Sequence, residues 1–440
     1  MKNTSLGYHT IYPYKKLTTK ERSLLYNDFA NFQKATGEIK IYEKGLRLPP
    51  NVTGFFKELY TSPPVFYRMS YHRNDMGLRW DMRRRNYSPG FIRKPPGWLD
   101  KPVGYYDNDD KPCSIKAKIN PKDLTDVGGL AAATADNLRN VEDVFNKEAA
   151  RISPLLGELS SYAFSRIDYC FNADVRELQI GCTAEQMMSL IKQADIAHFE
   201  EEVAYDNKAR RMKPNKNSFR LKSKFVRINC YCKGDQLAKQ YPDNPYIEKA
   251  HNVIRFEPQC FYSKVYAMSR DIKEKTQCSD SELMYELLSD ERCADIIRYY
   301  FHKTIGKGDY FTLDGAIEMV HLQKMKDKTK LQLIDALRHV NESRGIPNAK
   351  NKLKGEKLES FKHSIWELNS IGINPVTVPR RERFQWRVNE LGVKYIPNLL
   401  NAYYDALKNG DFPLTAEMKR HLSKYSWEMV ADDFHAEGKI

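Results

Sequence analysis

Residues 226–233 read VRINCYCK and alternate strictly between apolar and polar side chains. Successive side chains of an extended strand point to opposite faces, so the stretch predicts a half-buried β-strand. The apolar face holds Val226, Ile228, Cys230 and Cys232, and the polar face holds Arg227, Asn229, Tyr231 and Lys233. The tyrosine and the lysine on the polar face are candidates for chemistry, because burial in a core does not account for them.

Two other stretches show the same alternation. Residues 165–172 read SRIDYCFN, and residues 251–257 read HNVIRFE. The first sets Ile167, Tyr169 and Phe171 against Arg166, Asp168 and Asn172; the second sets Ile254 and Phe256 against His251, Arg255 and Glu257, with Val253 among the latter. Both stretches therefore predict strands with one apolar and one polar face.

The three strands would share one polar surface if they belonged to a single antiparallel sheet whose other side is covered. That surface would bring Asp168, Glu257 and His251 together with Tyr231 and Lys233. Two carboxylates and an imidazole are suitable ligands for Mg²⁺ or Mn²⁺. The alternative is an ordinary solvent-facing sheet whose charges form cross-strand ion pairs.

A run of positive charge precedes the strand that carries Tyr231. Residues 207–225 contain no acidic residue and eight basic ones, namely Lys208, Arg210, Arg211, Lys213, Lys216, Arg220, Lys222 and Lys224. Such a run favours binding to the phosphates of a nucleic acid, and a solvated basic loop is the alternative.

The composition indicates the same class of partner. The 440 residues carry a formal net charge of +14, and 12% of them are aromatic. Cations can follow phosphates while rings stack on bases, so this balance favours single-stranded nucleic acid. The chain has no apolar leader and no run long enough to cross a bilayer, and its eight cysteines include no C-x-x-C pair. We therefore expect a cytoplasmic protein with reduced thiols and no membrane partner.

The chain is expected to fall into three regions. Residues 1–110 are basic and aromatic, residues 111–270 mix strands with helices, and residues 271–440 read as mostly helical. Within the last region, residues 327–343 form an amphipathic pattern with Leu331, Ile334, Leu337 and Val340 at helical spacing. Short helices joined by basic turns are typical of a helix-turn-helix DNA reader, but a packing lobe would look the same.

The strings FSRIDYCFN, RINCYCKGDQL and VIRFEPQ, in this order, resemble rolling-circle replication initiators. The resemblance is to the gene II/X-type replication proteins of phages and plasmids and to the Rep_trans-type initiators and relaxases. In that pattern an R-x-D strand precedes a Y-x-K strand, which precedes an R-x-E strand. The resemblance implies an α+β fold, with an antiparallel-sheet nickase core of the HUH-like kind followed by a helical C-terminal domain.

The resemblance also implies a chemistry, in which a tyrosine attacks a DNA phosphate and frees a 3′-hydroxyl for a polymerase. It makes Tyr231 the nucleophile, assisted by Lys233, and makes Asp168 and Glu257 ligands of Mg²⁺ or Mn²⁺. The H-x-H metal pair of the wider superfamily is absent, because no two of the ten histidines are two residues apart. His251 is therefore the expected third ligand, and Arg166, Arg227 and Arg255 join the basic run 207–225 as expected DNA contacts. Expected partners are origin DNA, single-stranded or as a hairpin, and a host helicase and polymerase.

Several alternatives remain open. Tyr42, Lys44 and Gly45 repeat the Y-x-K-G string near the N-terminus, but without the R-x-D and R-x-E strands in the same order. The chain could instead be a non-catalytic nucleic-acid-binding or repressor protein with the same basic faces. A tyrosine recombinase would need a late tyrosine and a basic catalytic set on helices, and no convincing set is present.

Overall fold

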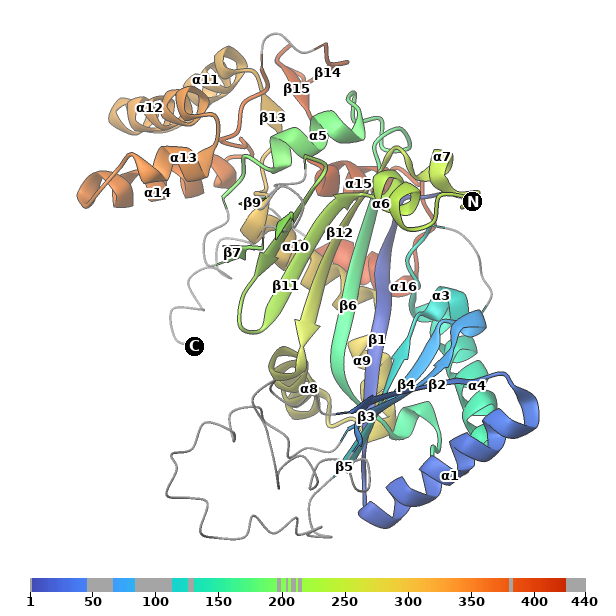
Figure 1. Ribbon diagram of the computed structural model, residues 1–440. Helices are drawn as coiled ribbons and strands as arrows, with labels where there is room; N and C mark the ends of the chain where they lie inside the picture. The colour runs from blue at the N-terminus through green and yellow to red at the C-terminus, as the bar shows by residue number, and fades with distance from the viewer. Residues whose placement is uncertain are drawn as a thin grey trace.

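The computed structural model describes residues 2–45, 66–83, 113–125, 130–195, 199–202, 205–206, 211–212, 216–379 and 383–424. A large antiparallel sheet forms the centre of the molecule, and helices cover it (Figure 1). This arrangement confirms the α+β class. Within the described residues the sheet has ten strands in the order β2-β3-β4-β5-β1-β6-β12-β11-β10-β7.

The strands come from the whole first part of the chain. Their bounds are β1 Ser5–Leu17, β2 Lys40–Gly45, β3 Phe66–Arg73, β4 Leu78–Arg83, β5 Cys113–Ile119, β6 Ala163–Asp174, β7 Glu200–Glu201, β10 Ser218–Lys222, β11 Val226–Cys232 and β12 Val253–Phe261. A small separate hairpin pairs β8 (Tyr205–Asp206) with β9 (Arg211–Met212).

Strand β1 lies in the middle of the sheet, between β5 and β6. Its Tyr8 and Ile11 side chains are fully buried. The expected boundary near residue 110 therefore does not separate two bodies, because β1 to β4 are part of the same sheet as the later strands. A local reading of residues 1–110 could not detect this pairing, since the partners of β1 begin about 100 and 150 residues later.

One face of the sheet packs against helices from the C-terminal region. On this side Phe301 of α10 (Asp290–Thr304) lies 5.2 Å from Phe256, and Tyr403 of α15 (Leu399–Lys408) lies 5.3 Å from Phe171, measured between ring centroids. The Tyr169 hydroxyl donates to the carbonyl of Leu287, in α9 (Asp280–Leu287), at 3.0 Å. The apolar set of each predicted strand thus packs in this core, and its polar set lies on the other face of the sheet, where several polar side chains are also buried.

The N-terminal half of the sheet is covered by α1 (Thr19–Thr36) and α4 (Ala135–Ile152). Phe29 of α1 stacks on Tyr71 at 3.8 Å, and Phe145 of α4 packs against Trp80 at 6.2 Å. Thr18 is the N-cap of helix α1, and its side chain forms a capping box with Glu21. The helix ends before Gly37, which adopts a left-handed conformation.

Four short helices lie between the strands in the chain, namely α3 (Pro121–Leu124), α5 (Ala184–Ile191), α6 (Lys233–Gln240) and α7 (Ile247–Ala250). The longer helix α8 (Tyr262–Thr276) follows β12 and leads into α9. None of the helices within the described residues is both long and apolar enough to cross a membrane.

The C-terminal region is divided in space. Helices α10, α15 and α16 (Ala416–Lys424) lie beside the sheet, whereas the segment between α10 and α15 forms a separate lobe (Figure 1). The lobe consists of β13 (Tyr310–Phe311), α11 (Leu313–Leu322), α12 (Asp327–Ser343), α13 (Ile346–Asn351), α14 (Glu356–Ser370), β14 (Arg387–Val388) and β15 (Lys394–Ile396). The expected helical domain 271–440 is therefore part sheet cover and part lobe.

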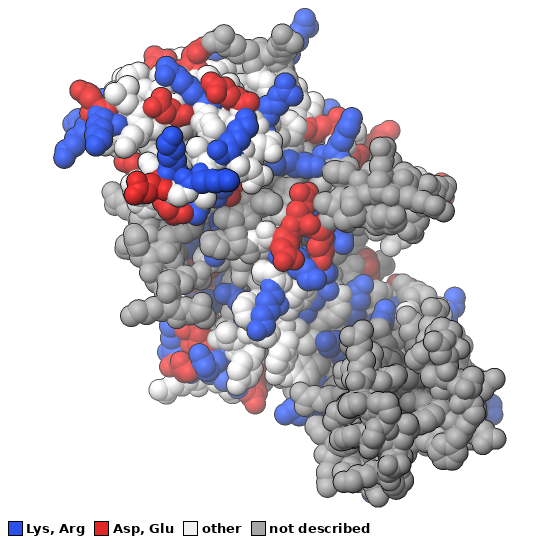
Figure 2. All heavy atoms as spheres, turned by 60° about the vertical axis from the view of Figure 1, so that its left-hand side comes forward, with Lys and Arg blue, Asp and Glu red and all other residues white. Residues whose placement is uncertain are grey.

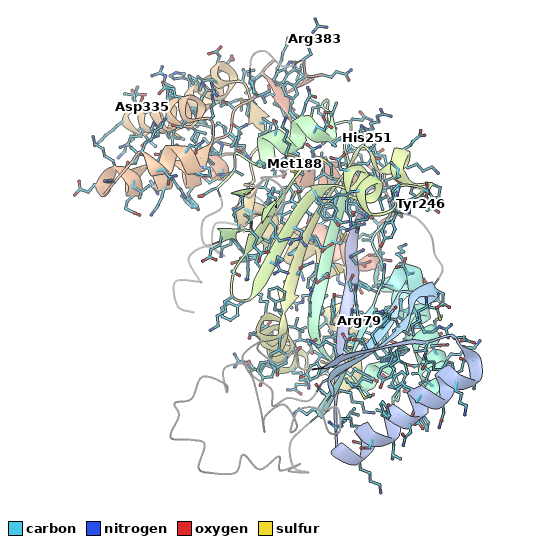
Figure 3. All side chains as sticks on the ribbon, in the orientation of Figure 1. Arg79, Met188, Tyr246, His251, Asp335 and Arg383 are labelled. Carbon is cyan, nitrogen blue, oxygen red and sulfur yellow. The ribbon has the colours of Figure 1, made fainter. Side chains whose placement is uncertain are left out.

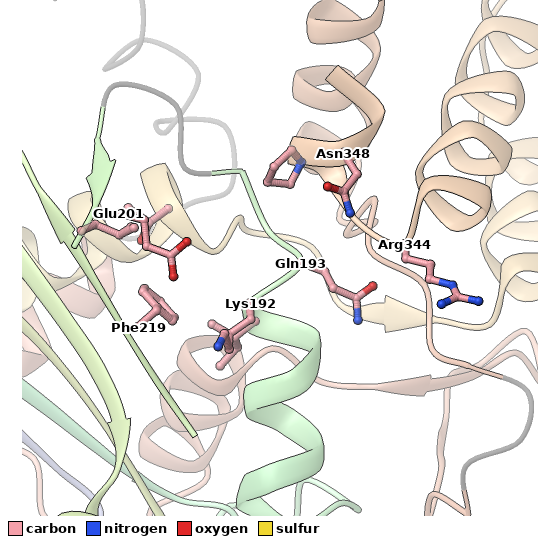
Figure 4. Close-up of a pocket in the computed structure, with 10 residues that line it drawn as sticks. Lys192, Gln193, Glu201, Phe219, Arg344 and Asn348 are labelled. Carbon is pink, nitrogen blue, oxygen red and sulfur yellow. The ribbon is translucent and has the colours of Figure 1, made fainter. Parts of the chain in front are cut away.

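Backbone and side-chain contacts hold the lobe to the sheet. The Ile346 amide donates to the Gln193 carbonyl at 2.9 Å, and Lys350 forms an ion pair with Asp195. Beside this junction lies a cavity of about 220 Å³ whose lining includes Lys192, Phe219 and Arg344 (Figure 4). These contacts fix the lobe near the β10 edge of the sheet.

Candidate active site

The three predicted strands are neighbours in the sheet, in the order β6-β12-β11. Their polar residues meet in rows across the strands, because Tyr231 pairs with Arg255, Asn229 with Glu257, and Gln259 with Asp168. The structure therefore brings Tyr231, Asp168 and Glu257 onto one polar face.

Tyr231 lies beside a buried positive charge. Arg255 is only 3% exposed, and its guanidinium donates from Nε to Asn172 Oδ1 at 2.7 Å and from Nη2 to the Leu130 carbonyl at 3.2 Å. Burial, followed by the Glu257 carboxylate, raises the pKa of Tyr231 above its usual value of 10.0, and the Arg255 charge opposes this shift. The phenol is therefore protonated at rest and needs a proton acceptor before it can attack.

Lys233 lies close to the same tyrosine, although it is not on the strand. It is the first residue of α6, and its Nζ lies 5.9 Å from the centroid of the Tyr231 ring. Nζ donates to Gln236 Oε1 at 2.6 Å. Burial, followed by the charge of Arg255, lowers the pKa of Lys233 to about 7, so a large fraction of the amine is neutral at neutral pH.

The glycine of the Y-x-K-G string has a packing reason. A Cβ atom on Gly234 would lie 2.8 Å from the Cα of His251, which is closer than real side chains approach backbone. The absence of a side chain lets the start of α6 lie against the turn that precedes β12. This contact keeps Lys233 near Tyr231.

Asp168 and Glu257 are both almost fully buried on the polar face. Arg166 Nε and Nη2 donate to the two oxygens of Asp168 at 2.6 and 2.8 Å. Burial raises the pKa of Asp168 to about 7, against the opposing hydrogen bond and charge of Arg166. Glu257 Oε1 accepts from Gln259 Nε2 at 2.6 Å and from Asn229 Nδ2 at 3.3 Å.

The expected third metal ligand, His251, is not brought to these carboxylates. It is exposed in the turn after α7, because β12 begins only at Val253 (Figure 3). The histidine beside Glu257 is His9 of β1, whose Nδ1 lies 3.5 Å from Glu257 Oε2. Burial, followed by the charge of Arg255, lowers the pKa of His9, which keeps the ring neutral.

The residues present do not form a preassembled cation site. Both Asp168 oxygens are held by Arg166, and Glu257 Oε1 is held by two amides. Among the described residues, no group of three or more His, Cys, Asp or Glu side chains is arranged to hold a metal ion. A cation bound by both carboxylates would have to use the lone pairs that these hydrogen bonds leave on the carboxylate oxygens.

Strand β1 contributes residues that the sequence did not reveal. A register shift between Tyr8 and Thr10 interrupts the alternation of side chains between the two faces of β1 at His9. Beyond this shift, Tyr12 lies on the polar face of the sheet. The Arg166 guanidinium lies 4.7 Å from the centroid of the Tyr12 ring, so this second tyrosine also borders the Arg166–Asp168 pair. Alternation within residues 5–17 could have indicated a strand, but its place beside β6 is a long-range property.

The expected DNA-binding residues are only partly placed. Arg210 and Lys213 lie outside the described residues, and for Arg211 only the backbone in β9 is described. Exposed positions are Lys216, Arg220, Lys222 and Lys224, whereas Arg227 is partly buried, and Arg166 and Arg255 belong to the polar face itself.

An acidic residue neutralises part of the basic surface. Glu202 lies 3.8 Å from Arg220, 3.5 Å from Lys222 and 3.1 Å from Arg227. The run 207–225 contains no acidic residue, but the fold places Glu202, which precedes the run in the sequence, beside its basic side chains. Acidic and basic side chains accordingly lie interspersed on this side of the molecule (Figure 2).

No family model matches the chain, and a search of curated proteins finds no significant match. A search of solved structures finds, among others, a rolling circle replication initiator protein from Geobacillus stearothermophilus. That structure is 9% identical with a TM-score of 0.28, over 67% of this chain and 84% of the other. A likeness at this level carries no weight for function, so the chemistry is inferred from the residues themselves.

Proposed function

We propose that this protein cuts and rejoins one strand of DNA through a phosphotyrosine intermediate, and thereby starts rolling-circle replication of a phage, plasmid or related mobile element. The observation that carries the proposal is the row formed by Tyr231 and Arg255, with Lys233 beside it and Asp168 and Glu257 on the same face. An ordinary solvent-facing sheet would not need to bury an arginine and two carboxylates next to a tyrosine.

In the proposed step, the Tyr231 oxygen attacks a backbone phosphorus and the bond from phosphorus to the 3′ oxygen breaks. The phenol proton passes to the neutral amine of Lys233, directly or through a water molecule, and the departing 3′ oxygen takes up a proton. The product is a 5′-phosphotyrosine link and a free 3′-hydroxyl, which a polymerase can extend. Attack of a 3′-hydroxyl on the link reverses the step and rejoins the strand.

Arg255 is proposed to stabilise the negative charge that develops on the phosphate. Its Nη1 is buried and makes no hydrogen bond of normal geometry to a described residue. The guanidinium is close enough to Tyr231 to oppose the rise in the pKa of its hydroxyl. Preorganised positive charge at the reacting atoms is a strong source of catalysis because no reorganisation is needed.

The cofactor and the partners are also part of the proposal. Mg²⁺ or Mn²⁺ dependence remains an expectation, and no step is assigned to a metal because the described residues include no group of three or more His, Cys, Asp or Glu side chains arranged to hold one. Three exposed cations in and beside β10, which leads to the strand of Tyr231, are proposed to hold the DNA backbone: Lys216, Lys222 and Lys224. A host helicase and polymerase are the expected partners of the nicked origin.

The decisive experiment traps the covalent link. The purified protein is incubated with supercoiled DNA of its replicon, or with a pool of single-stranded oligonucleotides, and adducts are isolated under denaturing conditions and mapped by mass spectrometry. We expect an adduct on Tyr231, and none with Tyr231→Phe. Tyr241→Phe, which alters a tyrosine that is 60% exposed at the far end of α6, serves as the matched control. DNA binding without any adduct would favour the non-catalytic alternative.

A further inference from the structure

Together with the preceding helix α10, which lies beside the sheet, the lobe has the element order of a winged helix-turn-helix. Helix α10 is followed by β13, α11 and α12, and a hairpin of β14 and β15 then pairs with β13 in the order β13-β15-β14. Residues 323–326 form the short turn between α11 and α12, and α13 and α14 are inserted before the hairpin. In DNA readers of this architecture the second helix of the pair lies in the major groove.

Helix α12 has one buried and one exposed face. Its buried side chains, which pack in the lobe, include Leu333, Ile334, Leu337 and Val340. The opposite face is an exposed stripe at helical spacing, consisting of Lys328, Leu331, Gln332, Asp335, Arg338 and Glu342. Leu331 is 61% exposed, which is a large apolar exposure for the middle of a helix.

The N-terminal end of this stripe is positively charged. Residues 323–330 contain four lysines and one acid, and Lys324, Lys326 and Lys328 are exposed. The residue before the helix, Lys326, provides no side-chain cap for the first-turn amides. A polyanion is the complementary partner for such an end, because the helix dipole and the lysines act in the same direction.

The hairpin forms a second projection from the same lobe. Asn389 Oδ1 accepts from the amides of Leu391 at 3.1 Å and Val393 at 2.9 Å, and these bonds fix the shape of the tip. Val388 and Leu391 are each 59% exposed, and Lys394 is exposed beside them. The tip also presents the exposed acid Glu390. Its apolar and basic groups can contact the groove or backbone next to the helix.

From this arrangement we infer that the lobe reads the sequence of double-stranded DNA. The stripe on α12 enters the major groove, where Gln332 and Lys328 form hydrogen bonds with base edges and Leu331 contacts thymine methyl groups. The hairpin rests on the flanking DNA. The inference concerns duplex recognition and stands apart from the cutting step, although it gives the proposed enzyme a means of choosing its origin.

The contacts between the lobe and the sheet would let the lobe bind the duplex while the sheet cuts one strand. Arg387 of the hairpin strand donates to the Leu178 carbonyl at 2.7 Å, and the Gln385 amide donates to the Gly181 carbonyl at 2.8 Å. A Cβ atom on Gly181 would lie 1.8 Å from the Gln385 oxygen, so this contact requires a glycine. A duplex held by α12 is thereby kept at a fixed position relative to Tyr231.

The test is a selection from a randomised pool of duplex DNA with the full-length protein. We expect one sequence motif to be enriched. The double variant Leu331→Ala and Gln332→Ala should bind the selected duplex about tenfold to a hundredfold more weakly, and should bind unselected duplex almost as well as before. The control variant Lys354→Gln and Lys357→Gln, which changes exposed charges in the same lobe, should keep the selected motif and its affinity.

Two results would overturn the inference: no enrichment by the wild-type protein, or unchanged affinity for the selected duplex in the α12 variant. In the second case, an α12 variant that nicks poorly although it binds the duplex normally would point to a protein partner on this face. Tyr231→Phe should select the same motif as the wild type, so failure of the nicking proposal and failure of this inference give different results.

Discussion

Tyr231 lies directly opposite Arg255 across the β11–β12 pair, and Arg255 lies opposite Asn172 on the next strand. Asn172 is fully buried and accepts from Arg255 Nε, so the guanidinium has little freedom to move. A charge that is fixed beside the attacking oxygen can stabilise a transition state, whereas a mobile surface charge would first have to be ordered.

Replacing Arg255 by Lys should retain the positive charge and remove the planar fork. We expect nicking to fall by about a hundredfold, on the scale known for the loss of one preorganised donor, while DNA affinity changes little. Single-turnover nicking and a binding titration measure the two effects. Equal losses in both would show that Arg255 serves binding and not the reaction.

The choice of nucleophile can be tested with three matched changes. Tyr231→Phe should abolish the covalent adduct, whereas Tyr12→Phe and Tyr42→Phe should retain it. Tyr12 is the informative comparison because it borders the Arg166–Asp168 pair, and Tyr42 because it repeats the Y-x-K-G string. Thermal unfolding of each variant verifies that the fold is kept. An adduct that survives in Tyr231→Phe and disappears in Tyr12→Phe would transfer the role to β1.

The nicking rate should depend on the protonation of Lys233. Because its pKa is lowered to about 7, the neutral amine becomes available as pH rises, and the rate should increase from pH 6 to 8 and then level off. Lys233→Arg keeps a charge that does not titrate in this range, so its residual rate should lack this rise. A wild-type rate that is flat over the same range would exclude Lys233 as the proton acceptor.

The same group should shape the pH dependence of stability. Between pH 7 and its ordinary pKa of 10.5, Lys233 is protonated in the unfolded chain but largely neutral in the folded chain. The unfolded chain therefore binds more protons, and the free energy of unfolding should rise with pH across this window. Denaturant unfolding at several pH values measures the slope, which should be smaller in Lys233→Met.

Substitutions of His9 and His251 can show which histidine belongs to a metal site, because His251 was the expected ligand and His9 is the observed neighbour of Glu257. If a divalent ion binds at the carboxylates, Asp168→Asn, Glu257→Gln and His9→Ala should each lower nicking and weaken Mn²⁺ binding. His251→Ala should have little effect because this side chain lies in the exposed turn before β12. Nicking at varied Mg²⁺ and Mn²⁺ concentrations, with spectroscopic Mn²⁺ titration, checks both. Full activity in excess EDTA would show that no metal is needed.

Glu202 should limit DNA affinity. It lies within 4 Å of three basic side chains, so Glu202→Gln should free cations, raise affinity at low salt and steepen the dependence of affinity on salt. Arg220→Gln combined with Lys222→Gln should do the reverse, lowering the slope by about 0.7–0.9 for each DNA phosphate that the variant no longer neutralises. An unchanged slope in both variants would mean that the DNA backbone passes elsewhere.

The sequence predicted local features well. Alternation located the strands that carry Asp168, Tyr231 and Glu257, because the two faces of a strand follow from residue order alone. Their polar faces coincide because β6, β12 and β11 are neighbours in the sheet, which residue order does not reveal. It placed His251 on a strand that begins two residues later, since the end of a strand depends on α7 and on pairing with β6. It missed His9 because β1 reaches Glu257 only through a sheet whose strands are far apart in the sequence. It missed Glu202 because this residue meets the basic run only when β7 pairs with β10.

The central place of β1 has a consequence for how the chain reaches its folded state. Its first partner strand, β5, begins at Cys113, and its second, β6, ends only at Asp174, so β1 leaves the ribosome long before either partner exists. Contacts of such high sequence separation slow folding, and an unpaired apolar strand is exposed to aggregation meanwhile. A fragment that starts near residue 111 would lack β1 to β4, so β6 would become an open edge and β5 would lose both of its neighbours. We expect this fragment to be insoluble. Supplying residues 2–45 as a separate chain should restore some soluble material, as a missing strand does when it is added back in trans.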